Sequence, residues 1–323
     1  MEKKIFITRK IPDIAAKMLQ EKGYSVDINE KDKVLSKSKL IFILNKKHYD
    51  AALTLLTDKI DKEVFEKAPS VRIFSNFATG FDNIDLNEAK SRGVTVTNAP
   101  APLTPESVAE HTFALMFALA KKVMEGDRFT RAGKYKGWEP MGFLGGDVSG
   151  KTLGLVGAGR IGQRLAELAK AMDMSVIYTD VNRNSELEEK CGAEYMASIK
   201  DLLPKADFVS LHVPLLPSTH HLINEDNLRL MKPSAYLVNT SRGPVIDEKA
   251  LERVLQKKML AGAGLDVYEF EPKVTPGLRK MNNTILTPHI ASASATVRDQ
   301  MAKISAQNII DFFEGRMPKY ALD

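Results

Sequence analysis

The amino-acid sequence predicts an α/β protein with two domains. Short apolar runs of β type alternate with stretches of helical periodicity before residue 100, and the same alternation returns after residue 152. Such alternation is typical of parallel sheets that carry helices on both faces. A proline-rich stretch, NAPAPLTPE, separates the two series, and 323 residues are enough for two medium-sized domains.

The first series contains strands and helices of ordinary length. Lys4–Thr8 is a predicted strand, and a helix is expected from Asp13 to Lys22, where Gly23 stops it. Leu40–Leu44 is interpreted as a buried strand because all five residues are apolar. The other expected strands are Tyr24–Ile28, Val71–Asn76 and Val94–Thr97, and the other expected helices are Asp61–Lys67 and Leu86–Ser91.

A long helix is expected from about Pro105 to Ala132. Its central part, Phe113–Ala120, is apolar on most sides, which predicts burial between layers or between subunits. The segment 133–150 is rich in glycine, predicted to be irregular, and contains the only tryptophan, Trp138. The second series is expected to have strands within Thr152–Val156, Ser175–Thr179, Asp207–Val213, Ala235–Asn239 and Ala263–Val267, and a last helix over Ser294–Glu314.

Composition excludes several classes of function. No apolar run approaches the roughly 18 residues that span a membrane, and the N-terminal apolar run is too short for a signal peptide. The single cysteine, Cys191, excludes an internal disulfide framework and favours a cytoplasmic protein. The net charge of +5 comes from scattered residues, without the basic stripe and interleaved aromatic residues of a nucleic-acid surface.

The segment GAGRIG (157–162) predicts a dinucleotide-binding loop. It follows a buried strand and opens an amphipathic helix. Gly157 permits a tight turn, Gly159 lets a pyrophosphate approach the backbone, and Gly162 allows helix and strand to pack closely. Arg160 and Ile161 open the helix, whose free N–H groups attract an anion.

The residue expected to select the cofactor is Asp180, which ends the next predicted strand. Its carboxylate would accept hydrogen bonds from ribose hydroxyls and would repel a 2′-phosphate. The sequence therefore predicts NAD as cofactor, with NADH preferred over NADPH. Arg183 lies close enough in sequence to weaken that preference.

Polar side chains follow three further predicted strands, at the sheet edge where open α/β sheets bind ligands. The planar guanidinium of Arg242 suits a carboxylate. The stretch DVYEFEP (266–272) holds three acids, and a carboxylate there would orient an imidazole. His289, in LTPHIASAS, is placed by the rigid Pro288 between an apolar run and the last helix.

Each of these three features also has a structural interpretation, namely a turn arginine, a solvated acidic loop and a loop histidine. His212 is the second choice for an acid–base histidine, whereas His48, His220 and His221 are interpreted as surface residues. Together with the dinucleotide loop, the three features favour hydride transfer at a hydroxyl-bearing carbon beside a carboxylate. The sequence shows no metal-ligand motif and no nucleophile elbow.

Seven motifs, in order and over nearly the full length, resemble those of the D-isomer-specific 2-hydroxyacid dehydrogenases. They are GFDNIDL (80–86), VAEHTFALM (108–116), GKTLGLVGAGRIGQRLA (150–166), LHVPLLPST (211–219), LVNTSRGPVIDE (237–248), GLDVYEFEP (264–272) and TPHIASA (287–293). Within this family the chain is most similar to glyoxylate/hydroxypyruvate reductases, on LTLLTDKID (53–61) and NFATGFDNID (76–85).

The resemblance implies a role for each site residue. His289 would be the general acid in the reduction, Glu271 its orienting partner, and Arg242 the clamp on the substrate. The N–H groups of Thr79 and Gly80 would bind the substrate carboxylate. Leu53 would line the pocket for the substrate side chain, and the implied cofactor contacts are Val213, Pro214, Thr219, Thr240, Ser241 and Asp266.

The resemblance also implies the architecture: a Rossmann dinucleotide-binding domain inserted into a smaller flavodoxin-like α/β substrate domain. Residues 1–100 and 288–323 would form the substrate domain, and 101–287 the NAD-binding domain. A homodimer is expected, and Trp138 resembles a tryptophan that reaches the partner's site in some members.

The expected activity is the NAD(P)-dependent reduction of a small 2-ketoacid, namely glyoxylate or hydroxypyruvate, to the corresponding D-2-hydroxyacid. The alternatives are a D-lactate or 3-phosphoglycerate dehydrogenase and, from a different class, a dinucleotide-sensing corepressor-like binding protein.

Overall fold

The computed structural model describes residues 2–31 and 33–322 and divides into two compact units. Unit 1 runs to Thr104 and resumes at Ala293, and unit 2 is Pro105–Ser292. Residues 288–292, which the sequence assigned to the returning substrate domain, thus lie in unit 2. The reason is local hydrogen bonding, because Ile290 and Ala291 donate their N–H groups to the carboxylate of Asp266.

Unit 1 is built on a six-stranded sheet in the order β13-β5-β4-β3-β1-β2. Five strands are parallel, and the short β13 pairs antiparallel with β5. The order 2-1-3-4-5 of the parallel strands is that of the flavodoxin-like doubly wound sheet. The strands are β1 (Lys4–Ile7), β2 (Ser25–Ile28), β3 (Ala51–Thr54), β4 (Ile73–Asn76), β5 (Thr95–Thr97) and β13 (Ala321–Leu322).

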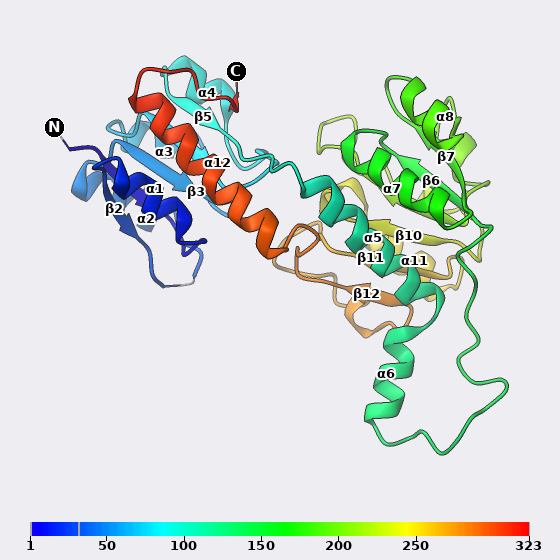
Figure 1. Ribbon diagram of the computed structural model, residues 1–323. Coiled ribbons are helices and arrows are strands. Elements are labelled where there is room, and N and C mark those ends of the chain that lie inside the picture. Colours follow the sequence, from blue (N-terminus) through cyan, green and yellow to red (C-terminus); the bar gives the residue numbers. More distant parts are fainter. Residues whose placement is uncertain (1, 32, 323) are drawn as a thin grey trace. The chain divides into compact units, whose positions relative to one another are not determined.

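Helices cover both faces of this sheet because successive side chains of a strand point to opposite faces. Ile5 and Ile7 pack in one apolar layer with α1 and α12, whereas Phe6 packs in the other layer with α2 and α3. Figure 1 shows α1 and α12 side by side on one face. The helices are α1 (Ile14–Glu21), α2 (Lys37–Lys47), α3 (Lys62–Lys67), α4 (Leu86–Ser91) and α12 (Ala295–Phe313).

Unit 2 holds a parallel seven-stranded sheet in the order β12-β11-β10-β9-β6-β7-β8. This is the Rossmann order 3-2-1-4-5-6 with a seventh strand added, and the order reverses between β6 and β9. The strands are β6 (Thr152–Val156), β7 (Ser175–Thr179), β8 (Glu194–Tyr195), β9 (Phe208–Leu211), β10 (Tyr236–Asn239), β11 (Gly262–Leu265) and β12 (Thr284–Leu286).

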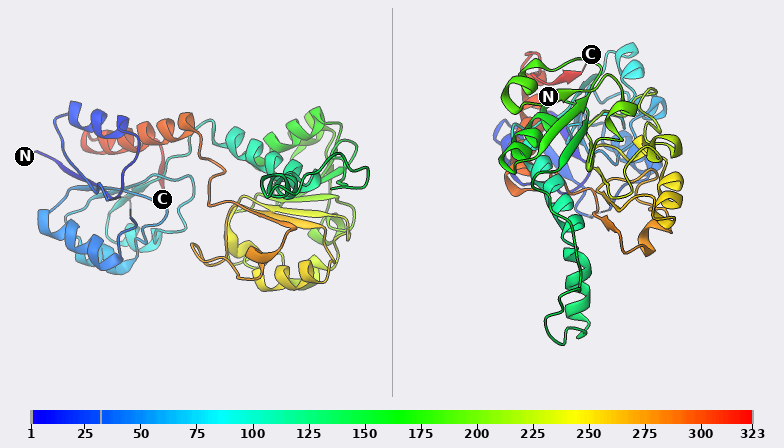
Figure 2. Two further views of the ribbon diagram at one scale, coloured as in Figure 1. Left: turned by 90° about the horizontal axis from the view of Figure 1, so that it is seen from below. Right: turned by 90° about the vertical axis from the view of Figure 1, so that its right-hand side faces the viewer.

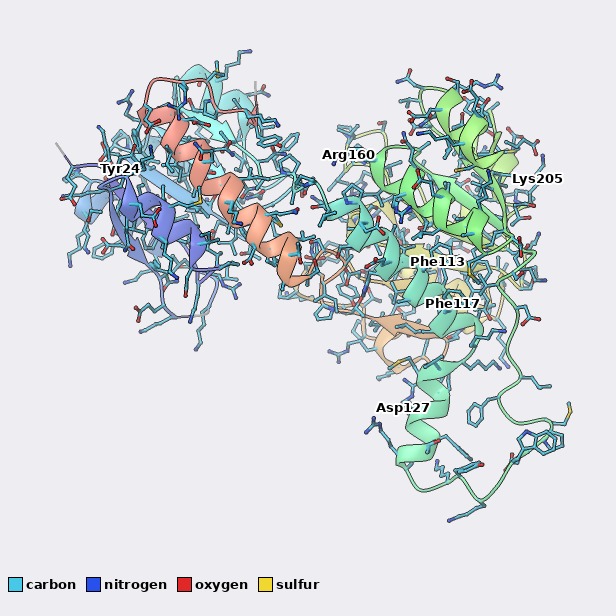
Figure 3. All side chains as sticks on the ribbon, viewed as in Figure 1. Tyr24, Phe113, Phe117, Asp127, Arg160 and Lys205 are labelled. Atoms are coloured by element: carbon cyan, nitrogen blue, oxygen red, sulfur yellow. The ribbon has the colours of Figure 1, made fainter. Side chains whose placement is uncertain are left out.

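Two layers of helices sandwich the sheet of unit 2 (Figure 2). One layer comprises α5 (Thr104–Ala120), α7 (Arg160–Ala171) and α8 (Ser185–Cys191), and the other α9 (Ile199–Leu202), α10 (Glu225–Leu228) and α11 (Glu248–Gln256). Short 3-10 turns lie at Gly243–Val245 and Leu278–Lys280. Phe113 and Phe117 follow one another along α5, with ring centroids 5.8 Å apart (Figure 3). Among the described helices, none is long and apolar enough to cross a membrane.

The predicted strand at Leu40–Leu44 is wrong, because this run lies inside α2. Its buried side chains, Leu40, Ile41 and Leu44, recur at helical spacing, and Ser36 caps the helix by accepting a hydrogen bond from the Lys39 N–H group. A short apolar run fits a buried strand and a buried helix equally well by pattern. The strand that enters the sheet here is β3, which the pattern did not reveal.

The single helix expected over residues 105–132 is two helices. α5 ends at Ala120 and α6 (Val123–Arg131) begins after Lys122, whose left-handed backbone (φ 52) interrupts the helical path. α6 has no buried residue. Figure 1 shows α6 and the segment after it extending away from the sheet of unit 2 before the chain returns to β6.

Candidate active site

The glycine-rich loop lies at the carboxyl end of β6, where the strand order of unit 2 reverses. Gly157 has a φ of 101°, and a Cβ there would lie 2.8 Å from the carbonyl carbon of His212. A Cβ on Gly162 would collide with the carbonyl oxygen of Gly157. A Cβ on Gly159 would meet no atom within 4 Å. Two of the glycines therefore serve packing, whereas Gly159 leaves room for a ligand to approach the backbone.

The start of α7 is open to an anion. Within the described part of the chain, no side chain caps this helix at Gly159, and its first N–H groups carry the positive end of the helix dipole. Arg160 stands at this end, with Ile161 next to it (Figure 3). Asp180, just after β7, accepts hydrogen bonds from the N–H groups of Ala158 (2.6 Å) and Val181 (2.7 Å). This arrangement fits the pyrophosphate and ribose of a dinucleotide.

The expected proton-transfer pair is assembled in unit 2. The Nδ1 atom of His289 lies 3.1 Å from Oε2 of Glu271. Because a carboxylate only accepts hydrogen bonds, Nδ1 carries the hydrogen and donates it, which leaves Nε2 for a second partner. Both side chains are about one-third exposed, at 29% for His289 and 34% for Glu271. The imidazole is therefore oriented on one side and accessible on the other.

The charge state of Glu271 follows from its surroundings. Burial raises the pKa of the carboxyl group. This effect is outweighed by the hydrogen bond and charge of His289, by the N–H of Tyr268 (3.2 Å) and by the charge of Arg242. The pKa of Glu271 ends below its ordinary value, so the group is a carboxylate at neutral pH. A fixed negative charge therefore faces Nδ1 of the His289 imidazole.

Asp266 holds the loop that carries His289. It is fully buried, and its carboxylate accepts hydrogen bonds from the Ile290 N–H (2.8 Å), the Ala291 N–H (2.8 Å) and the Thr287 hydroxyl (2.6 Å). The N–H of His289 donates to the carbonyl oxygen of Asp266 (2.8 Å). These bonds hold His289 in a left-handed backbone conformation (φ 56). Asp266 is thus committed to the loop in this structure, and its expected cofactor contact stays a prediction.

A histidine that the sequence analysis did not single out joins this network. Nε2 of His111, on α5, lies 3.2 Å from the Thr287 hydroxyl and 3.6 Å from the Asp266 carboxylate. Because the Thr287 hydroxyl donates to Asp266, it accepts from His111. The only signal in the sequence was a histidine within an otherwise apolar helix, which does not indicate its partner.

The third acid of the stretch 266–272 serves a different contact. The carboxylate of Glu269 lies 2.9 Å from Nε2 of His221 and accepts a hydrogen bond from the Glu248 N–H group at 3.1 Å. His221, interpreted from sequence as a surface residue, is therefore partly buried and paired. Of the three carboxylates, only that of Glu271 lies within hydrogen-bond distance of the His289 imidazole among the described residues.

His212, the second choice for acid–base chemistry, is not suited to it. Burial lowers the pKa of its imidazole to about 4, so the ring is neutral at neutral pH. Its Nε2 atom lies 2.9 Å from the Ser210 hydroxyl, and its backbone packs against Gly157. His212 therefore packs against the glycine-rich loop and has a structural role there.

The remaining predicted cofactor residues lie in loops after β9 and β10. The Thr219 hydroxyl closes the turn after Val213 and Pro214 by donating to the Pro214 carbonyl oxygen (2.6 Å). Thr240 and Ser241 directly follow β10, and the Arg242 guanidinium donates to the Ser241 carbonyl oxygen (2.8 Å). These loops stand at the carboxyl edge of the sheet, as the sequence positions required.

Three of the predicted substrate residues lie in unit 1: Leu53 within β3, and Thr79 and Gly80 after β4. Thr79 is exposed and Gly80 is half-buried. Among the described residues, no acceptor takes a hydrogen bond from either N–H group. Leu53 differs from the expectation: it is fully buried within β3 and packs in the core, because helices cover both faces of that strand. The first side chain after β3 that is clearly exposed is Leu56.

Comparison with known proteins is consistent with this geometry. The family profile described as D-isomer specific 2-hydroxyacid dehydrogenase, NAD binding domain, matches residues 113–291. The chain is 46% identical to a glyoxylate reductase of Thermococcus litoralis, over 98% of this chain and 96% of that one.

Two solved structures extend the comparison. A glyoxylate reductase from Paecilomyes thermophila is 29% identical, with a TM-score of 0.87, over 99% of this chain and 98% of that one. A D-lactate dehydrogenase from Aquifex aeolicus, complexed with NAD and lactic acid, is 32% identical, with a TM-score of 0.82, over 97% and 96% of the chains. The chain is an NAD(P)-dependent oxidoreductase and belongs to the D-isomer specific 2-hydroxyacid dehydrogenase family.

Proposed function

We propose that the chain is a cytoplasmic enzyme that reduces glyoxylate or hydroxypyruvate to the corresponding 2-hydroxyacid, with NADH as the preferred cofactor. The observation that carries the proposal is the pairing of His289 with Glu271 in the unit that also holds the dinucleotide loop. The full-length similarity to a glyoxylate reductase supports the substrate class. A reducing compartment suits the free thiol of Cys191.

Each residue has a defined part in the reaction. A dinucleotide held at the loop 157–162 would supply the hydride for the carbonyl carbon of the substrate. His289, held through Nδ1 by Glu271, gives a proton from Nε2 to the carbonyl oxygen as negative charge develops there. The guanidinium of Arg242 draws electron density toward that oxygen and holds the acid in place. The N–H groups of Thr79 and Gly80 bind the substrate carboxylate, and Leu56 replaces Leu53 as the residue proposed to contact the substrate side chain.

A panel of 2-ketoacids tests the proposal directly. The purified protein is mixed with NADH or NADPH and with glyoxylate, hydroxypyruvate, pyruvate or 3-phosphohydroxypyruvate, and the loss of reduced nicotinamide absorbance is followed. The highest kcat/KM is expected for glyoxylate or hydroxypyruvate. A preference for pyruvate would instead favour the D-lactate dehydrogenase alternative. Absence of turnover with every acid would contradict the proposed function.

The preference for NADH is proposed to depend on Asp180. Arg183 does not oppose it in this structure, because its guanidinium makes two hydrogen bonds to Glu188, at 2.7 and 2.8 Å. Replacing Asp180 with alanine removes the acceptor for the ribose hydroxyls and the repulsion of a 2′-phosphate. We expect kcat/KM for NADH to fall by about tenfold or more, while that for NADPH rises.

The matched control for Asp180→Ala is Glu186→Ala. Glu186 is a nearby acid whose side chain is 60% exposed and pairs with Lys190 on the surface of α8. Its removal changes the net charge equally and should leave the ratio of the two kcat/KM values unchanged. An unchanged ratio in Asp180→Ala as well would overturn the proposed role of Asp180.

We propose that the chain forms a homodimer through α6 and the segment 133–147. This region exposes several large apolar side chains, among them Trp138 (83%), Met141 (76%) and Leu144 (57%). Figure 3 shows side chains along this extension, with Asp127 on α6 for orientation. Contiguous apolar side chains of this size typically mark a protein–protein interface.

Light scattering tests the dimer. The wild-type protein should have twice the mass of the chain, and replacing Trp138 and Met141 with serine should raise the dimer dissociation constant by about tenfold or more, because buried tryptophans dominate such interfaces. The control is Phe42→Ser, which removes an apolar side chain that is 54% exposed on α2. A mass equal to that of one chain for the wild type would rule the dimer out.

A further inference from the structure

The loop after β4 shows an arrangement of peptide groups that the expected role of Thr79 and Gly80 does not explain. Three successive carbonyl oxygens of this loop accept hydrogen bonds from the body of unit 1. The Ala78 carbonyl accepts from the Ala99 N–H (2.8 Å), and the Thr79 carbonyl accepts from the side-chain amide of Asn98 (2.7 Å). The Gly80 carbonyl accepts from the side-chain amide of Asn76 (3.1 Å).

Fixing a carbonyl oxygen also fixes the N–H group of the following residue. The peptide unit is planar and trans, so its C=O and N–H point in opposite directions. The three held carbonyls therefore orient the N–H groups of Thr79, Gly80 and Phe81, in that order. None of these three N–H groups donates a hydrogen bond within the described part of the chain. Among the described residues, the loop thus presents three adjacent N–H donors without an acceptor. Their directions are set by the hydrogen bonds to the carbonyl groups of the same peptide units.

The two asparagines are themselves held firmly. Asn76 is fully buried, and its amide also donates to the side-chain oxygen of Asn83 (3.1 Å). Asn98 is 8% exposed, its N–H donates to the Tyr320 carbonyl (3.2 Å), and its carbonyl accepts from the Asn308 side chain (3.0 Å). A buried donor with this support is a rigid anchor, and it also polarises the peptide group it contacts.

We propose that Asn98 and Asn76 are positioning residues that hold the N–H groups of Thr79, Gly80 and Phe81 ready for the carboxylate of the substrate. The inference rests on the proposed function, and it adds Phe81 as a third backbone donor. Set in advance, the donors lose little orientational entropy when the acid binds. Neither asparagine contacts the substrate, and both act through the peptide groups.

Replacing Asn98 with alanine tests the proposal. The Thr79–Gly80 peptide group loses its anchor, so we expect KM for the ketoacid and the inhibition constant of oxamate to rise by about tenfold. The turnover number and the dissociation constant of NADH should change little, because proton transfer and cofactor binding use other residues. Asn98→Asp keeps the shape but sets an oxygen against the Thr79 carbonyl, so its effect should be at least as large. This second variant decides the matter if the alanine variant does not fold.

The matched control is Asn227→Ala. Asn227 is also 8% exposed, and its amide also donates to a backbone carbonyl, that of Leu222, at 2.7 Å. The Asn227→Ala variant should lower the melting temperature by about as much as Asn98→Ala does. It should not raise KM for the ketoacid or the inhibition constant of oxamate. Values of KM and the oxamate constant in Asn98→Ala that match the wild type would overturn the inference, as would an equal rise in Asn227→Ala.

Failure of the proposed function can be distinguished from failure of this inference. If the wild-type protein binds oxamate in the presence of NADH but turns over no ketoacid, the proposed function fails. Calorimetric oxamate binding by Asn98→Ala then still decides the inference.

Discussion

Replacement of His289 with alanine is expected to lower the rate of ketoacid reduction by about 10²–10⁴-fold, the usual contribution of a positioned general acid. The loss should appear in kcat, because the proton is transferred in the reaction step. The dinucleotide loop is separate from His289, so NADH should bind as before. Steady-state kinetics and a fluorescence titration with NADH measure the two effects independently.

His221→Ala is the matched control for His289→Ala. His221 is another partly exposed histidine whose ring nitrogen lies 2.9 Å from a glutamate oxygen, in this case of Glu269. This variant should keep most of its activity, because nothing assigns His221 to the reaction. If His289→Ala also kept its activity, the assignment of the general acid would be wrong.

Replacing Glu271 with glutamine tests whether the charge of this carboxylate supports proton transfer from His289. The pKa of Glu271 lies below the ordinary value, so the carboxylate acts as an anion throughout the neutral range. Glu271→Gln preserves the shape but removes that charge. We expect kcat for ketoacid reduction to fall by about tenfold or more in steady-state kinetics, because Nδ1 of His289 loses its carboxylate partner. The dissociation constant of NADH should stay unchanged.

The second large effect is expected for Gly243→Ala. A Cβ on Gly243 would overlap the carbonyl group of Tyr268 and would lie 2.5 Å from the Glu269 nitrogen. Both obstacles are backbone atoms, so either the loop with Arg242 or the loop with Glu271 must move. We expect a loss of about 1–3 kcal/mol in the free energy of unfolding. We also expect a fall of about 100-fold in kcat/KM, because displacement by an ångström is enough for that.

Gly126→Ala serves as the comparison for Gly243→Ala. Gly126 lies within α6, and a Cβ there would meet no atom within 4 Å. Alanine is the better helix former, so this variant should be as stable as the wild type or more so. Thermal unfolding and ketoacid kinetics are measured on both proteins. Wild-type stability and kinetics in Gly243→Ala would show that the close approach at Tyr268 is not needed.

Much of the fold was predictable because each strand and helix has a local sequence pattern that agrees with its place in the sheets. Alternating strands and helices indicated both sheets, and the glycine spacing indicated the phosphate loop. The run Leu40–Leu44 was misassigned because five consecutive apolar residues carry no periodicity. The turn at Lys122 was missed because neither a proline nor a glycine marks it, and only its φ of 52 reveals the break.

From the residues alone, the site was predictable in residue types rather than in partners, and Glu271 was named as the partner of His289 only through the family resemblance. Three acids lie within six residues, and sequence spacing cannot decide which of them meets His289. The structure assigns them to different contacts, because Asp266 is buried beneath the loop and Glu269 pairs with His221. The complete burial of Leu53 was not predictable for a related reason. Burial on both faces of β3 depends on α12, which arrives from the far end of the chain.

The division of the chain into two units bears on which of its parts homologous proteins can exchange. The peptide groups held by Asn76 and Asn98 belong wholly to unit 1, and the histidine with its carboxylate belongs wholly to unit 2. The chain passes between the units only near Thr104 and near Ser292. Two crossover points therefore suffice to exchange unit 2 between homologues. Neither the hydrogen bonds of Asn76 and Asn98 nor the pair of His289 and Glu271 would be divided. Recombination can therefore exchange the loop proposed to bind the carboxylate while the pair of His289 and Glu271 is inherited intact.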